Sequence, residues 1–212
     1  GKALGFTVKN VDGYAGHVEY GNRGPLIGIL VHLDVVPAGD GWNHEPFGGE
    51  IEDNTVYGRG AADNKGPAIA ALYVLRAFAD QVPDPEIRFR IIFGTNEESG
   101  MEGVKYYLDH EEMPVYGFSP DSGYPLYNRE MGIVNVHLQA SRRGRRIVSS
   151  FSGGEALNMV ANQARVVVMP EYSERARALI EQIKSRGSVE DRLELEETKE
   201  GLLVKAKGIS AH

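Results

Sequence analysis

Cysteine is absent from this 212-residue sequence, so the chain offers neither a disulfide framework nor a thiolate metal site. No apolar run approaches the roughly 20 residues that a membrane-spanning helix needs, and no signal-peptide pattern opens the chain. Lysine and arginine number 23 against 30 aspartates and glutamates, which disfavours nucleic acids and anionic membranes as partners. We therefore expect a cytoplasmic protein, although the lack of cysteine does not exclude export.

Strand-like and helix-like segments alternate in the first half of the sequence. Short aliphatic runs flanked by glycine and proline indicate buried strands, and apolar residues spaced three and four apart indicate helices. The expected order is strand, helix, strand, helix, strand, over residues 25–36, 64–79, 88–95, 98–110 and 115–119. This order predicts an α/β fold with a mostly parallel sheet and flanking helices.

The pattern changes near residue 132. Alternating apolar and polar residues predict short strands, and one amphipathic stretch predicts a helix over residues 173–184. The predicted strands cover residues 133–138, 164–168, 193–196 and 202–206. Antiparallel pairs with one helix form a small α+β unit, so we divide the chain into two domains, 1–131 and 132–212.

One histidine and several acidic residues follow the predicted strands. His32 ends the most apolar run of the chain, and carboxylates recur at Asp63, at the pair Glu97–Glu98 and at Asp121. In open α/β sheets ligands bind beyond the carboxyl ends of the strands, so these side chains should converge. One imidazole with several carboxylates suits a divalent metal, and with more than one metal it suits hydrolysis.

Each of these residues also has a purely structural explanation. His32 and Asp34 could be a buried histidine satisfied by a neighbouring carboxylate. Asp63 precedes a predicted helix and could be its N-cap, as could Asn64. The Glu97–Glu98 pair could favour the positive end of a helix dipole, although two adjacent glutamates also suit one metal ligand beside one general base. Asp121 could form an Asx turn.

Three sequence strings together resemble a known family. Residues 32–37 read HLDVVP, residues 58–66 read GRGAADNKG, and residues 94–100 read GTNEESG. In this order they are similar to motifs of the aminoacylase/carboxypeptidase-type co-catalytic zinc metallopeptidases. Within that family, the segment Ser119–Pro120–Asp121 looks most like the bacterial Xaa-His, or β-alanyl, dipeptidases of peptidase V type. The resemblance implies a zinc-peptidase catalytic domain followed by a smaller lid domain.

The resemblance also implies a set of metal ligands. His32, Asp63 and Asp121 would bind one zinc ion. Asp63 would bridge to a second zinc ion that is also held by Glu98. The intact parent protein would therefore carry two zinc ions in each active site, with manganese or cobalt as alternative metals.

Further roles follow from the same resemblance. Glu97 would be the general base, and Asp34 would orient the metal-binding histidine. His212 matches a lid histidine that contacts the substrate. Asn158 would be another substrate contact, although Ala161–Asn162 stands where the family usually has Pro-Asp.

We expect zinc-dependent hydrolysis of dipeptides, with a dipeptide or N-acyl amino acid as the substrate and no nucleic-acid or membrane partner. One alternative is a deacylase or desuccinylase on the same scaffold. Another is a catalytically inactive fragment or homologue that acts as a binding module. The chain stops at the lid histidine, so we expect a fragment that lacks the C-terminal half of the family pattern and is itself inactive.

Overall fold

The computed structural model describes residues 1–139, 144–157, 159–185 and 192–208. His212 and Asn158 lie outside the described residues. The chain divides into two compact units. Unit 1 contains residues 1–38 and 42–131, and unit 2 contains residues 39–41 and 132–212.

Unit 1 is built on a five-stranded mixed sheet. Its strand order is β1-β2-β6-β3-β7, with bounds Thr7–Val11, Ala15–Tyr20, Arg88–Gly94, Leu26–His32 and Tyr116–Phe118. The pairs β1–β2 and β2–β6 are antiparallel, whereas β3 runs parallel to both β6 and β7. The α/β prediction is confirmed, and the parallel half of the sheet is the part that brings three strand ends to one edge.

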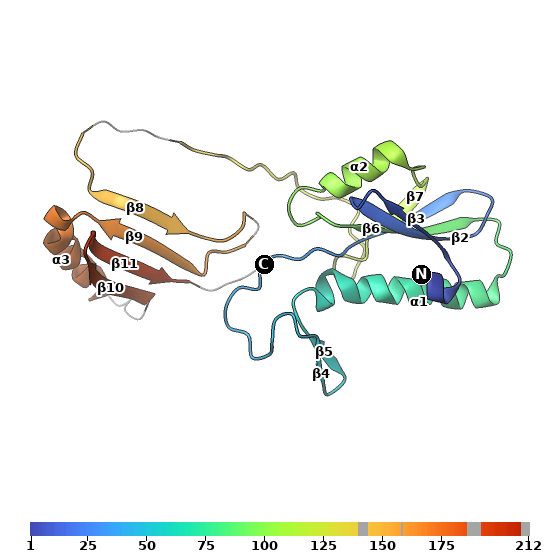
Figure 1. Cartoon of the computed structure of the whole chain (residues 1–212), viewed down its shortest axis with the longest axis horizontal. Helices are drawn as coiled ribbons and strands as arrows, with labels where there is room; N and C mark the ends of the chain where they lie inside the picture. Colours follow the sequence, from blue (N-terminus) through green and yellow to red (C-terminus); the bar gives the residue numbers. More distant parts are fainter. Residues whose placement is uncertain (140–143, 158, 186–191, 209–212) are drawn as a thin grey trace. The chain divides into compact units, whose positions relative to one another are not determined.

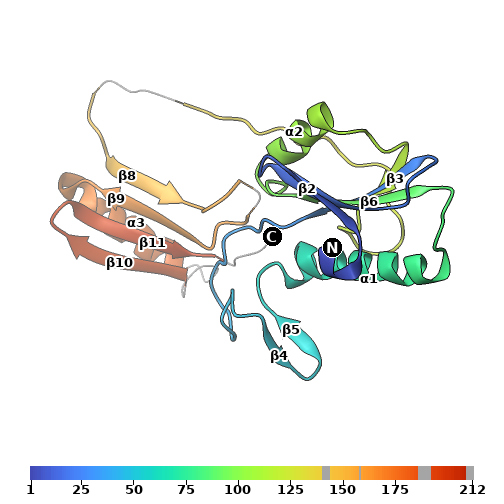
Figure 2. The ribbon, with the colours of Figure 1, turned by 45° about the vertical axis from the view of Figure 1, so that its right-hand side comes forward.

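Two helices cover opposite faces of this sheet, α1 (Gly66–Gln81) and α2 (Glu102–His110) (Figures 1 and 2). Successive residues of a strand point to opposite faces, so Ile91 packs under α1 while Ile92 packs under α2. The α1 side also buries Val18, Val31 and Leu75. Burial on both faces explains why β3 and the second half of β6 are almost continuously apolar.

Both helices begin later than the sequence pattern predicts. A π-helical turn, η2 (Ala61–Lys65), precedes α1, and a turn at residues 97–100 precedes α2. The N-cap of α1 is Lys65, without a side-chain hydrogen bond, so the interpretation of Asp63 or Asn64 as its cap is wrong. The acidic pair at residues 97–98 likewise stands outside α2, which removes the helix-dipole explanation.

The antiparallel hairpin β1–β2 is absent from the sequence-based prediction. Its turn contains Asp12 and Gly13, both with positive φ (52° and 78°). Asp-Gly between alternating residues is a strong hairpin signal, because this dipeptide tolerates left-handed backbone conformations. A short 3-10 turn, η1 (Lys2–Leu4), precedes the hairpin.

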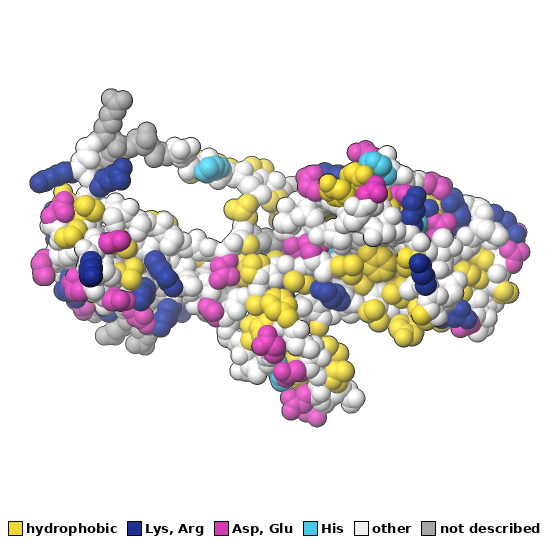
Figure 3. Space-filling view, viewed as in Figure 1, with side chains coloured by type: hydrophobic (Ala, Val, Ile, Leu, Met, Phe, Trp, Pro, Cys, Tyr) yellow, Lys and Arg dark blue, Asp and Glu magenta, His cyan; other side chains and the backbone are white. Residues whose placement is uncertain are grey.

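The long connection after β3 contains a small hairpin, β4 (Glu50–Glu52) and β5 (Thr55–Tyr57). Its turn residues Asp53 and Asn54 have positive φ. Exposed apolar side chains lie beside acidic ones on this hairpin, drawn in yellow and magenta in Figure 3.

Unit 2 is a four-stranded antiparallel sheet with one helix. The strand order is β10-β11-β9-β8, with bounds Leu193–Thr198, Gly201–Lys207, Gln163–Val168 and Val148–Gly153. A short turn, η3 (Pro170–Tyr172), leads into α3 (Ser173–Lys184), whose Ala176 and Ile180 pack on the buried Leu202. The helix has the predicted bounds.

The strand predicted at residues 133–138 is wrong. These residues are irregular, and their apolar side chains are exposed. A strand needs a neighbour to accept and donate its backbone hydrogen bonds, and no strand within the described residues pairs with this segment.

A buried polar network lies between the sheet and α2. The hydroxyl of Tyr107 lies 2.8 Å from Nδ1 of His17 and accepts a hydrogen bond from Arg90 at 3.1 Å. The Arg90 guanidinium in turn donates to Glu19 at 2.5 Å. Burial raises the pKa of Tyr107 to about 12, with Arg90 opposing. Burial and the Arg90 charge lower the pKa of His17 below its usual value, so His17 is neutral in the folded protein at neutral pH.

This network predicts a pH-dependent stability term. The unfolded chain protonates His17 near its ordinary pKa of ~6.5, whereas the folded chain resists protonation. The stabilisation is therefore fully present above that value and is lost as the pH falls through it. Between pH ~7.5 and ~5.5 the unmodified chain should lose more unfolding free energy than His17→Asn. Urea denaturation at both pH values measures the difference, and equal losses would contradict the lowered pKa.

Candidate functional site

The fold brings the predicted site residues to one edge of the unit 1 sheet. His32 is the last residue of β3 and pairs with Gly94, the last residue of β6. Glu97 follows β6, and Asp121 follows the parallel strand β7. Asp63 lies in η2, and one of its carboxylate oxygens is close to a ring nitrogen of His32 and a carboxylate oxygen of Asp121. Asp63 therefore reaches the same edge of the sheet.

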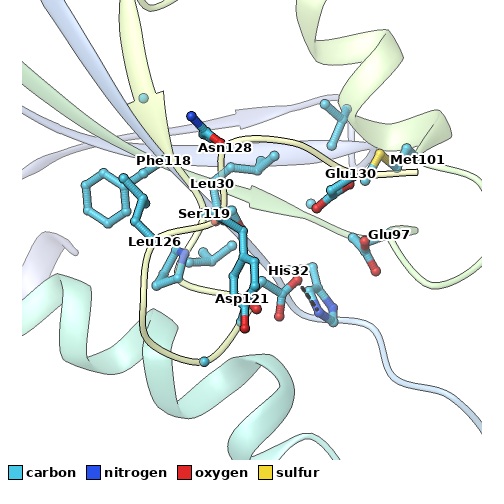
Figure 4. Close-up of a pocket in the computed structure, with 18 of the residues that line it drawn as sticks. Leu30, His32, Glu97, Met101, Phe118, Ser119, Asp121, Leu126, Asn128 and Glu130 are labelled. Carbon is cyan, nitrogen blue, oxygen red and sulfur yellow. Dashed lines mark hydrogen bonds and ion pairs between the residues drawn. The ribbon is translucent and has the colours of Figure 1, made fainter. Parts of the chain in front are cut away.

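Three of these side chains form a compact group. Nε2 of His32 lies 2.9 Å from Oδ1 of Asp63 and 3.5 Å from Oδ2 of Asp121. The three donor atoms all lie within 4.8 Å of one another, and no other histidine–carboxylate group of this kind occurs within the described residues. Figure 4 shows His32 and Asp121 turned toward each other, with Glu97 beside them. Asp63 has a non-helical backbone, and the Asp63–Asn64 peptide bond is cis.

The ring of His32 is held by the residue two positions further along. His32 is only 2% exposed, and its Nδ1 lies 3.0 Å from the backbone carbonyl oxygen of Asp34. A carbonyl oxygen can only accept, so Nδ1 carries the hydrogen and the neutral ring turns the lone pair of Nε2 toward the two carboxylates. A cation between these atoms removes the repulsion between that lone pair and the carboxylate oxygens.

The carboxylate of Asp34 has its closest contacts elsewhere. It accepts hydrogen bonds from the backbone N–H groups of Glu97 and Glu98, each at 3.1 Å, while one of its oxygens lies 3.4 Å from Nδ1 of His32. Asp34 therefore joins the end of β3 to the turn after β6. The sequence pattern gives no signal for this second contact, because it depends on two strands that are distant in the chain.

The surroundings of His32 favour its protonated form. Burial opposes protonation, but the Asp121 charge and the hydrogen bonds with Asp63 and the Asp34 carbonyl outweigh it, and the pKa of His32 is raised. The carbonyl and carboxylate of Asp34 and the carboxylates of Asp63 and Asp121 surround the imidazole, and together they create a strongly negative electrostatic potential there. Such a position accepts either a proton or a metal cation.

Glu97 lies in a less polar position than an ordinary surface glutamate. Burial raises the pKa of Glu97, the His32 charge opposes this shift, and the Asp121, Glu98 and Asp34 carboxylates add to it. A raised pKa makes a carboxylate a stronger proton acceptor. Glu97 thus stands in the same cleft as His32 and Asp121, two residues of the group that could hold a cation.

A cleft of about 880 Å³ opens at this edge of unit 1. His32, Glu97 and Asp121 line it together with apolar side chains from several elements. In Figure 4, Phe118 and Leu126 lie at one end of the cleft, and Met101 and Glu130 lie at the other. A cleft of this size accommodates a small molecule that is partly apolar.

Glu98 is the predicted metal ligand that lies outside the group of three, although its backbone is bound by Asp34. Its role as a ligand of a second metal stays a prediction. The same holds for the substrate contacts His212 and Asn158, which lie outside the described residues.

Asn64 also belongs to the site, although its place in the sequence predicts only a possible N-cap of the following helix. Its side chain accepts a hydrogen bond from the His32 backbone and donates to Pro120 and Asp121. Asparagine in the string Asp-Asn-Lys-Gly gives no separate signal of this role, because its partners come from β3 and from the turn after β7.

The donor atoms fit a divalent cation. One neutral imidazole nitrogen and two carboxylate oxygens are a ligand set that zinc and manganese accept, and hydrogen bonding at Nδ1 is the usual arrangement for a metal-binding histidine. The sequence profile described as Peptidase family M20/M25/M40 matches residues 28–193. The chain belongs to this family.

Relatives of this M20 chain carry dipeptidase names. YtjP of Bacillus subtilis (strain 168), provisionally named a dipeptidase, is 44% identical over 79% of this chain and 37% of its own length. The Beta-Ala-Xaa dipeptidase of Lactobacillus delbrueckii subsp. lactis is 38% identical over 79% of this chain and 36% of its own length. SH1171 of Staphylococcus haemolyticus, also provisionally named a dipeptidase, is 38% identical over 94% of this chain and 45% of its own length. The M20 chain therefore spans less than half the length of each.

The raised pKa of His32 predicts the pH dependence of metal binding. A proton at Nε2 competes with the metal, so apparent zinc affinity should fall with decreasing pH, beginning above the ordinary histidine pKa of ~6.5. Calorimetric titration with zinc at several pH values should show one tight site per chain and proton release on binding. Asp121→Asn should weaken this site severely. Affinity that is independent of pH would contradict ligation by His32.

Proposed function

We propose that the full-length protein is a metal-dependent dipeptidase and that this chain carries its metal-binding cleft. The observation that supports this most is the placement of Glu97 in the same cleft as His32 and Asp121, whose donor atoms form a compact group with Asp63. Membership of a peptidase family and the dipeptidase names of its relatives agree with this proposal. Zinc is the metal that we propose first, because its ligand preferences match one imidazole and two carboxylates.

The residues of the cleft divide the chemistry between them. His32, Asp63 and Asp121 would hold the cation, which when bound polarises the peptide carbonyl and acidifies a water molecule. Glu97 takes a proton from the attacking water and delivers it to the nitrogen of the leaving amine. A raised pKa suits both transfers, because the carboxyl group must accept and release the same proton.

Other residues support this arrangement. The Asp34 carboxylate fixes the backbone of Glu97, and its carbonyl fixes the ring of His32. We also propose that Asp63 and Glu98 hold a second cation in the full-length protein and that His212 and Asn158 contact the substrate. In this proposal unit 1 is the catalytic domain and unit 2 is the lid domain.

The charges of the cleft favour a substrate with a free amino group. Glu97, Asp121 and Glu130 contribute carboxylates, and none of the described lining residues is a lysine or arginine. Glu130 has no hydrogen bond or ion pair with another residue in the described parts of the chain. A carboxylate in that position attracts an ammonium group and repels a succinyl carboxylate. We therefore propose a dipeptide in preference to an N-acyl or N-succinyl amino acid.

None of the described helices is long and apolar enough to cross a membrane. The cytoplasmic location stays a prediction.

The central test is Glu97→Gln in the full-length gene product. Glutamine keeps the size of the side chain but cannot accept a proton, so turnover of dipeptides should fall ~10²–10⁴-fold while metal content is unchanged. Steady-state hydrolysis and metal analysis measure the two effects. Glu102→Gln is the matched control, because Glu102 is exposed at the start of α2 and bonds Lys105.

Near-normal turnover by Glu97→Gln would remove the general-base assignment. Loss of metal from this variant would instead make Glu97 a ligand. If the unmodified protein hydrolyses N-acyl amino acids and leaves dipeptides intact, the proposed substrate class is wrong.

Glu130→Gln tests the preference for a free amine. A hydrogen bond to a charged group contributes ~1.5–3 kcal/mol, so kcat/KM for β-alanyl dipeptides should fall roughly 10–100-fold. N-acetylated versions of the same peptides lack the ammonium group and should change little. Glu52→Gln, on the exposed β4–β5 hairpin, serves as the control. Equal losses for free and acetylated substrates would show that Glu130 does not read the amino group.

A further inference from the structure

Asn64 is buried in a segment whose neighbours are exposed. Its side chain has no exposed surface, whereas Asp63 and Lys65 on either side are open to solvent. A fully buried amide requires partners for its polar atoms. Its partners come from β3 and from the segment after β7, although Asn64 itself lies in η2 before α1.

The contacts determine the orientation of the amide. Oδ1 accepts a hydrogen bond from the backbone N–H of His32 at 3.3 Å. Nδ2 donates to the carbonyl oxygen of Pro120 at 3.2 Å and to Oδ1 of Asp121 at 2.6 Å. Reversing the amide would place its oxygen against a carbonyl and a carboxylate, and its NH₂ group against an N–H. Only one orientation therefore satisfies all three neighbours.

This orientation distinguishes the two oxygens of Asp121. Oδ1 is engaged by Asn64, and Oδ2 lies 3.5 Å from Nε2 of His32. An amide that donates to one oxygen prevents the carboxylate from rotating freely about its terminal bond. The oxygen that faces the cation position is thus selected by Asn64.

We propose that Asn64 is a positioning residue of the metal site, which presents Asp121 as a ligand through Oδ2 alone and holds it at a set distance from His32. This inference rests on the proposed metal-binding function. It assigns Asn64 no contact with the cation or the substrate. Partners that orient metal ligands in this way typically change metal affinity ~10–100-fold when they are removed.

The first test is zinc titration of the 212-residue chain and its Asn64→Leu variant. Leucine has a similar volume but cannot donate to Asp121, so zinc affinity should fall ~10–100-fold. Leu75→Ala is the matched control, because Leu75 is a buried residue of α1, the helix that follows η2, and belongs to an apolar core cluster. It should weaken the fold while leaving zinc affinity unchanged.

The second test uses Co²⁺ in place of zinc, because its visible absorption intensity reports coordination number. If Asp121 is free to bind through both oxygens in Asn64→Leu, coordination number rises and absorption intensity falls relative to the unmodified chain. Leu75→Ala should keep the original spectrum. A purely structural role for Asn64 would move the unfolding midpoint and leave the spectrum of the folded protein unchanged.

The outcomes separate the two proposals. If the unmodified chain binds no metal, the proposed function of the site fails. If it binds zinc and Asn64→Leu binds equally well with the same Co²⁺ spectrum, only the role of Asn64 is overturned. Asn64→Ser replaces the leucine variant if that variant does not fold by circular dichroism. If neither folds while Leu75→Ala does, Asn64 is a folding residue and the proposal is also overturned.

Discussion

The parallel pairing of β3 with β6 and β7 is the constraint on which the site depends. Parallel strands end at the same edge, so residues from three distant parts of the sequence meet without a dedicated binding loop. The register matters as well, because His32 pairs directly with Gly94. The edge is held further by Ser119, whose hydroxyl donates to the Leu30 carbonyl at 2.9 Å. A shift of one residue in β3 would turn the imidazole to the other face of the sheet.

The site concentrates negative charge around a single buried imidazole. Carboxylates in this position repel one another, and the exposure of Asp63 and Asp121 lets water screen only part of the repulsion. The structure offsets part of it with neutral donors, namely the amide of Asn64 at Asp121 and two backbone N–H groups at Asp34. What remains is compensated only by a positive charge at the centre. His32 and Asp121 line the cleft and also belong to the group that could hold a cation.

The local pattern predicts the elements that carry a clear apolar periodicity or an aliphatic run. The amphipathic spacing of α3 predicts its bounds, and the aliphatic runs of β3 and β6 predict strands. The starts of α1 and α2 were misplaced, because Asp63 and the pair at 97–98 look like helix-initiating residues while tertiary contacts hold them in turns. Residues 133–138 alternate like a strand but have no pairing partner in the described chain. The roles of Asn64 and of the Asp34 carboxylate depend on contacts between residues that are 32, 57, 63 and 64 positions apart, and no single-sequence pattern predicts such contacts.

The double hydrogen bond from Asp34 to the turn after β6 also has a dynamic consequence. Turns at the mouth of a cleft usually open independently of the sheet, on a faster timescale than the core. Here the two amides of the turn donate hydrogen bonds to Asp34, which lies two residues after the end of the central strand β3. Opening the turn therefore requires breaking contacts to the frame of the sheet itself. We therefore expect Glu97, the proposed proton acceptor, to be held nearly as rigidly as the sheet, although it lies in a turn.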